Sequence, residues 1–137
     1  MNPLRRLKIL FLVLLIAGTA VRQTKAQTPD EMALATLDRF MAAFNNQNIK
    51  AWAETLHYPH VRFASGQVMI YDSAATFQDR SVFPALKAAG WHHSLWTKRT
   101  ITLSSDTKVH IDTEFERQNA DNQTIGRYRS LYIVTER

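Results

Sequence analysis

Apolar residues recur at helical spacing in the part of the chain that begins at residue 28. Thr28-Pro29-Asp30-Glu31 has the Thr-x-x-Glu pattern of a capping box, with proline at the first helical position. The apolar residues that follow recur at intervals of three or four positions: Ala33, Leu34, Leu37, Phe40, Met41 and Phe44. This pattern predicts a helix from Pro29 that ends at the Asn-rich segment 45–48. A second helix is predicted over 49–57, because Asn48 can cap it and Pro59 ends it.

The period of the pattern changes after Pro59. Apolar residues alternate with polar or small ones on both sides of Ser65-Gly66-Gln67, which predicts a hairpin. Short helical segments are predicted from Ser73 to Phe77 and over 81–89, where Gly90 marks a helix end. Three long alternating segments then predict antiparallel strands over 91–103, 108–117 and 125–134.

Helices followed by a meander of strands predict an α+β domain in which the helices pack on one face of an antiparallel sheet. The length of 137 residues is that of one domain. The predicted core contains Phe40, Phe44, Trp52, Phe63 and Ile111.

The first 26 residues have the layout of a signal peptide. Residues 2–8 carry positive charge, residues 9–16 are all apolar, and small residues follow, with Ala26 as the expected last residue removed. The apolar segment is shorter than the roughly 20 residues that a spanning helix needs, so export with cleavage is favoured. An uncleaved membrane anchor is the alternative. We therefore expect an exported protein, periplasmic or secreted, whose domain covers residues 27–137 and has no stable membrane insertion after signal removal.

The formal net charge of +5 comes from the same segment. Five of the 17 Lys and Arg residues precede Ala26, whereas none of the 12 Asp and Glu residues does. Residues 27–137 are thus electrically balanced and offer no attraction to a phosphate backbone, so no nucleic-acid partner is expected. The absence of cysteine excludes a disulfide scaffold, a zinc–thiolate site and a cysteine nucleophile. Since no histidine pair has a recognised ligand spacing, we expect no metal, and since the sequence has no Gly-rich phosphate loop, we expect no cofactor.

Four segments resemble the NTF2-like superfamily, which includes the SnoaL-like polyketide cyclases and ketosteroid isomerase. The order of predicted elements over about residues 29–134 agrees with this resemblance. The segments are most similar to an uncharacterised bacterial branch of the superfamily. The segments are 37–45 (LDRFMAAFN), 58–62 (YPHVR), 90–94 (GWHHS) and 127–132 (RYRSLY).

The resemblance implies a cone in which a strongly curved sheet and the N-terminal helices enclose a ligand cavity. It also implies a homodimer formed through the outer face of the sheet, with a monomer as the alternative. Relatives close the sheet with one more strand after the segment that corresponds to 125–134. Because the sequence stops at Arg137, either the sheet lacks its final strand or the sequence is a piece of a longer chain.

Aromatic and imidazole side chains gather near the expected mouth of this cavity. The predicted ligand-binding residues are Tyr58, Trp91, His92, His93 and Trp96. The structural alternatives are that Trp91 and Trp96 are core or interface residues, and that His57 caps its helix while His60 is exposed.

Two functions follow from these residues. The favoured one is non-catalytic binding of a small apolar or aromatic ligand, since no catalytic constellation is readable from the spacing. The alternative is a cofactor-free isomerase, cyclase or hydratase in which His60, His92 or Asp112 removes a proton next to a carbonyl group. Asp112 belongs to the stripe His110, Asp112, Glu114 and Glu116, which can equally be a solvent face neutralised by Arg127 and Arg129.

Overall fold

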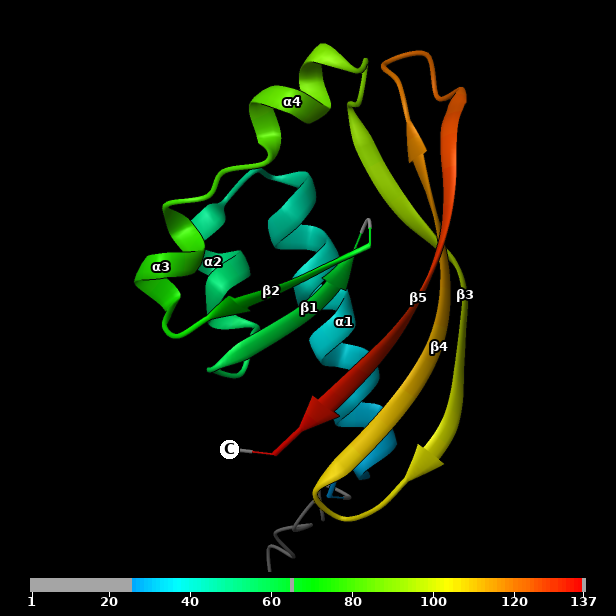
Figure 1. Ribbon diagram of the computed structural model, residues 1–137. Helices are drawn as coiled ribbons and strands as arrows, with labels where there is room; N and C mark the ends of the chain where they lie inside the picture. The colour runs from blue at the N-terminus through cyan, green and yellow to red at the C-terminus, as the bar shows by residue number, and fades with distance from the viewer. Residues whose placement is uncertain (1–25, 65, 137) are drawn as a thin grey trace, which may run out of the picture.

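The computed structural model describes residues 26–64 and 66–136. The predicted signal peptide lies outside the described residues except for Ala26. Helices lie on one side of a long, curved, three-stranded sheet, and a separate hairpin lies in front of the longest helix (Figure 1). The elements are α1 (Pro29–Asn45), α2 (Ile49–Glu54), β1 (His60–Ala64), β2 (Gln67–Tyr71), α3 (Ala74–Gln78), α4 (Phe83–Ala88), β3 (His93–Ser104), β4 (Lys108–Gln118) and β5 (Thr124–Thr135). The predicted α+β class is confirmed.

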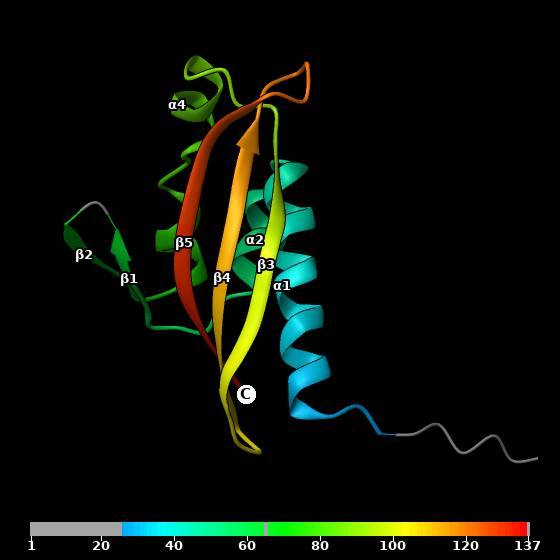
Figure 2. The same cartoon turned by 90° about the vertical axis from the view of Figure 1, so that its right-hand side faces the viewer.

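The start of α1 is the predicted capping box. The Thr28 backbone N–H donates to Oε2 of Glu31 at 2.8 Å, and the Glu31 N–H donates to Oγ1 of Thr28 at 3.2 Å. The buried side of α1 carries Ala33, Leu37 and Met41 at helical spacing. Helix α1 contacts all three long strands. In the turned view it runs next to β3 (Figure 2). No helix in the described part of the chain is both long and apolar enough to cross a membrane.

The three long strands pair antiparallel in the order β3-β4-β5. The central strand β4 turns Val109, Ile111 and Thr113 toward the helices, and all three side chains are buried. The Thr113 hydroxyl donates to the Ser130 carbonyl at 2.9 Å, so its burial leaves no unpaired donor. Register shifts in β3, on either side of the segment from Lys98 to Ile101, accompany the bend of the sheet.

The hairpin β1–β2 is a separate sheet of two strands. Its inner face packs Tyr71 and Met69 against the helices, whereas Phe63 lies on the outer face and is 79% exposed. The prediction that Phe63 belongs to the core is therefore wrong. Both faces of this hairpin carry apolar residues, so alternation alone could not decide which face meets the helices.

Aromatic rings fill the core between the helices and the start of β3. Phe44, Trp52, Phe77, Phe83 and Trp91 are all buried, and their ring centroids lie 4.8–6.0 Å apart in the contacting pairs. The predicted core positions of Phe44, Trp52 and Ile111 are confirmed, and Phe40 is partly buried against this cluster. Within the described residues, β5 pairs with β4 alone and β1 pairs with β2 alone.

Candidate functional site

A cavity of about 330 Å³ lies between the middle of α1, the end of α2 and the last residues of β5. Helix α2 ends at Glu54, and the chain then turns into β1, whose first residue also reaches the cavity. The lining residues are Thr36, Leu37, Arg39, Phe40, Glu54, Thr55, Leu56, His57, His60 and 132–135. The wall is thus part aliphatic, part aromatic and part polar, as is usual in small-molecule sites.

Tyr132 forms the aromatic wall of the cavity. Its ring meets Phe40 edge-on at 5.5 Å and Trp96 edge-on at 5.6 Å between centroids. Burial raises the pKa of Tyr132 to about 12, so its hydroxyl stays protonated at neutral pH. Among the residues that the structure describes, none forms a hydrogen bond with this hydroxyl. Tyr132 therefore contributes to the cavity wall a ring that is held in place by its aromatic neighbours.

His60 lies on the inner face of β1. Its ring stacks against Tyr71 at 6.1 Å and meets Phe77 edge-on at 6.2 Å. Burial lowers the pKa of His60, and the nearby Arg62 guanidinium lowers it further. His60 thus presents a neutral imidazole to the cavity at neutral pH.

His57 links the end of α2 to the end of β5. Its Nδ1 lies 2.6 Å from Oγ1 of Thr135, and both residues line the cavity. The alternative that His57 caps the carbonyls of its own helix is therefore not what the structure contains. The neighbouring Tyr58 turns its hydroxyl to the Ala53 carbonyl at 3.0 Å, away from the cavity lining.

Trp91 and Trp96 lie inside the protein on the side of the sheet that faces the helices. Trp91 stacks on Phe83, and its Nε1 donates to Oγ of Ser94 at 2.9 Å. Trp91 and Ser94 thus share a side, contrary to the alternation expected for a strand over 91–103, because β3 begins only at His93. The Trp96 Nε1 donates to the Leu37 carbonyl at 3.4 Å.

His92 and His93 lie at the start of β3, far along the sheet from the cavity. Their Nδ1 atoms are 3.3 Å apart, and His92 is exposed. None of the five predicted ligand-binding residues lines the cavity. Their roles in binding stay predictions.

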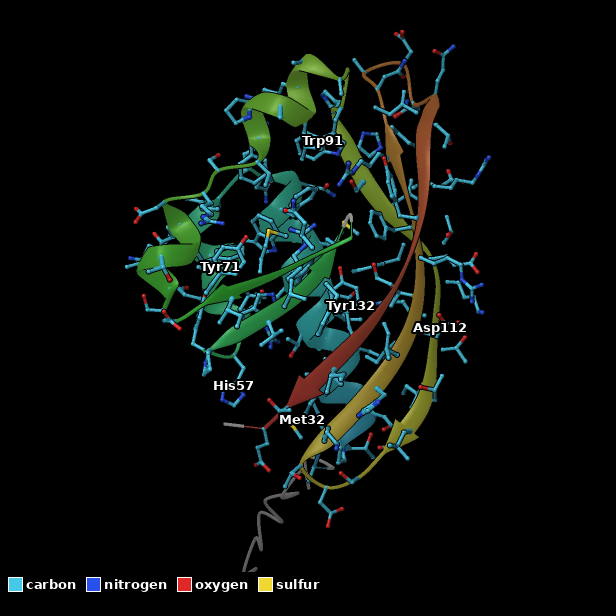
Figure 3. The ribbon with its side chains drawn as sticks, viewed as in Figure 1. Met32, His57, Tyr71, Trp91, Asp112 and Tyr132 are labelled. Carbon is cyan, nitrogen blue, oxygen red and sulfur yellow. The ribbon has the colours of Figure 1, made fainter. Side chains whose placement is uncertain are left out.

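Asp112 lies on the face of the sheet that is turned away from the helices (Figure 3). Its Oδ2 is 3.1 Å from Lys98 Nζ and 3.3 Å from an Nη of Arg129, and the hydrogen bond from Lys98 is the main reason for its lowered pKa. Arg127 pairs with Glu116 at 2.7 Å on the same face. The acidic stripe is thus a solvent face neutralised from both β3 and β5.

Reasoning from the sequence does not single out Tyr132. The register could have done so, because Tyr132 lies directly opposite Ile111, and Ile111 belongs to the row predicted to face the helices.

In the described parts of the chain, no three His, Asp or Glu residues come together as metal ligands would.

Solved structures with the same fold come from several bacteria. A protein of Xanthomonas campestris assigned as a calcium/calmodulin dependent protein kinase II association domain is 17% identical, with a TM-score of 0.56 over 82% of this chain and 84% of that one. The protein Aln2 from a Streptomyces species is 13% identical, with a TM-score of 0.55 over 81% and 89%. A Catenulispora acidiphila protein in complex with S-DNPA is 13% identical, with a TM-score of 0.54 over 75% and 78%.

At these identities the structural likeness establishes the fold and leaves the activity open. No curated protein sequence matches the chain significantly. The sequence profile of the family described as NTF2-like protein (DUF6841) matches residues 30–137, and the chain therefore belongs to this NTF2-like family.

Proposed function

We propose that the chain binds a small apolar or aromatic ligand in the cavity beside Tyr132. The observation that carries this proposal is the partly buried Tyr132 ring in the wall of a cavity of about 330 Å³. That volume lies within the roughly 300–1,000 Å³ range of small-molecule sites. Phe40 and Leu37 supply apolar contacts, while the Tyr132 hydroxyl and the His60 imidazole supply polar ones. The complex of the similar Catenulispora acidiphila protein with S-DNPA agrees with a ligand-binding role for this fold.

A fluorescence titration with the neutral apolar probe N-phenyl-1-naphthylamine tests this proposal. We expect saturable binding that Thr36→Phe abolishes, because the larger side chain fills the cavity. The matched control is Thr100→Phe, which adds the same group at an exposed position opposite Asp112. No saturable binding, or equal binding by both variants, contradicts the proposal.

A second candidate function is proton transfer by His60. Of the three predicted bases, His60 alone lines the cavity, and its lowered pKa keeps it unprotonated and able to accept a proton. The step would move a proton from the carbon next to a carbonyl group to His60, leaving an enolate that the Tyr132 hydroxyl can hydrogen-bond. Hydrogen–deuterium exchange of 2-tetralone, followed by NMR, should be accelerated by the protein and lost in His60→Gln. Exchange at the buffer rate with the unmodified protein contradicts this candidate.

We also propose that two copies associate through the outer face of the three-stranded sheet. Leu103, Leu131 and Ile133 gather on this face and are 55%, 60% and 56% exposed. Leu103 and Ile133 lie opposite His110 on the two neighbouring strands, and Leu131 lies two residues from Ile133 on β5. Leu103, Leu131 and Ile133 therefore form one patch. Sedimentation at micromolar concentration should give a dimer that Leu131→Asp converts to a monomer. A monomer mass for the unmodified protein contradicts the proposal.

Export by cleavage near Ala26 remains a proposal as well. Its support is the charged, apolar and small-residue order of the first 26 residues. N-terminal sequencing of the protein from its producing cell should start near Gln27. A start at Met1 contradicts it.

A further inference from the structure

The strand β5 has a free edge. It pairs with β4 on one side, and in the described parts of the chain no strand pairs with its other side. The hairpin β1–β2 lies on that side but forms a separate sheet (Figure 2). From Gly126 to Thr135 the pairing with β4 has no register shift, and β5 contains no proline. This edge therefore presents unpaired backbone N–H and C=O groups, and it lacks the bulge or proline that commonly blocks pairing with another chain.

The cavity beside Tyr132 lies at this edge. Neighbouring residues of a strand point to opposite faces of the sheet, so a cavity on one face is lined by every second residue. Here all four residues from 132 to 135 line the cavity. Tyr132 lies opposite the buried Ile111 and faces the helices, whereas Ile133 is 56% exposed on the outer face. A cavity lined by residues of both faces lies beside the edge of the strand, within reach of its backbone.

The other side of the cavity is formed by the segment after α2 and the first residue of β1. Residues 54–57 and His60 belong to this side, so the cavity lies between them and β5. His57 reaches across to Thr135, where its Nδ1 lies 2.6 Å from Oγ1. That contact closes the space at the end of β5, and the free edge continues from there toward Gly126. The cavity is therefore a pocket at one end of an open strand edge.

We infer that the cavity receives an aromatic side chain of an extended peptide whose backbone pairs with the free edge of β5. In recognition by strand addition, main-chain hydrogen bonds provide affinity and side-chain pockets provide specificity. The Phe40 and Tyr132 rings, with centroids 5.5 Å apart, and the Leu37 side chain give this pocket an apolar wall that suits an aromatic group. This inference rests on the proposed binding function and adds that the apolar group belongs to a peptide strand.

Amide hydrogen exchange of the isotope-labelled protein, followed by NMR, is the first measurement. In the free protein we expect rapid exchange at the alternate residues of β5 whose N–H groups point away from β4. Protection of these amides in the free protein would show that another segment of the chain or a second copy already covers the edge. That result would overturn the inference.

The probe is a short capped peptide in which threonine and valine alternate around a central phenylalanine. At saturation it should slow exchange at the same alternate amides at least about tenfold, because a paired amide exchanges only when the strand opens. Replacing the central phenylalanine by alanine should weaken binding at least about tenfold, since burial of the ring is lost. Two further peptides, N-methylated at alternating sets of backbone amides, are matched controls for each other. Only the set that faces β5 should lose binding, because alternate N–H groups of a strand point to opposite edges.

The outcomes separate the inference from the function on which it rests. Failure of both N-phenyl-1-naphthylamine and the peptide to bind contradicts the proposed binding function and the inference together. If the naphthylamine binds but the peptide does not, or if the peptide binds without protecting alternate amides of β5, the cavity binds ligands and the inference is wrong. Equal binding of the two N-methylated peptides, or peptide binding that Thr36→Phe leaves unchanged, also overturns it. The peptides are compared on the unmodified protein, so the decision does not depend on whether a variant folds.

Discussion

The side chain of Asn45 joins the end of α1 to the free edge of β3. Its Nδ2 donates to the Ser94 carbonyl at 2.8 Å, and its Oδ1 accepts from the Ser94 N–H at 2.8 Å. Since β3 pairs with β4 alone in the described chain, its other edge has no strand to satisfy these groups. The Asn45 amide therefore takes the place of a neighbouring strand for one residue. Ser94 is 2% exposed, so water cannot easily replace it.

We predict that Asn45→Ala lowers the free energy of unfolding by about 2–4 kcal/mol, because it leaves a buried N–H and a buried carbonyl unpaired at about 1–3 kcal/mol each. In a domain of this size the midpoint temperature should fall by about 10 °C or more. Asn45→Asp should be similarly damaging at pH 7, since its second oxygen would face the Ser94 carbonyl oxygen. Urea unfolding followed by circular dichroism measures both effects.

The neighbouring Asn46 provides the control. It is exposed, and its contribution to the end of α1 is made by its backbone N–H. Asn46→Ala should therefore change the free energy of unfolding by less than about 0.5 kcal/mol. An Asn45→Ala protein within about 0.5 kcal/mol of the unmodified one would refute the reasoning, since the Ser94 groups would then have found other partners.

Three further effects are expected. Gly126→Ala should lower the free energy of unfolding in urea by about 1 kcal/mol and move the Tyr128 ring, because a Cβ there would lie 2.6 Å from the Tyr128 hydroxyl oxygen. Unchanged stability and an unchanged Tyr128 NMR signal would contradict this. Thr28→Ala should cost about 1 kcal/mol through loss of the capping box, and a loss below about 0.3 kcal/mol would contradict the role of the cap. The pKa of His60 is lowered in the folded protein, chiefly by burial, so the unfolded chain takes up the proton first as the pH falls. Stability should therefore be full above the ordinary histidine value of 6.5 and decrease below it, and His60→Gln should remove that part of the decrease in pH-dependent urea unfolding.

Local sequence signals determined the positions of most elements. The Thr28 capping box and the spacing of Ala33, Leu37 and Phe44 act within a few residues of each other, so α1 could be predicted from them alone. The same holds for β4, where apolar and polar residues alternate along most of the strand and so predict it. These predictions succeeded because each depends on contacts that are close in the sequence.

Only the tertiary structure decided which face of the hairpin β1–β2 meets the helices. Its two faces differ by a shift of one residue, and both carry apolar side chains, so the choice depends on how Tyr71 and Phe77 pack across a turn. That choice turned Phe63 outward and brought His60 and Arg62 inward. The polar groups near the cavity therefore follow from packing between elements, which the pattern along one strand does not contain.

The tertiary structure also decided which residues line the cavity. The sequence marks the segment 58–62 as a candidate region, and His60 does line the cavity. Tyr132 comes from β5, far along the chain, and it joins His57 and His60 only because the last residues of β5 lie beside α1 and the segment that follows α2. The curvature arises from the twist of long paired strands and their register shifts, which are properties of the assembled sheet. A sequence specifies the faces of each strand, but the distance between residues on different strands is set by how the sheet bends over its helices.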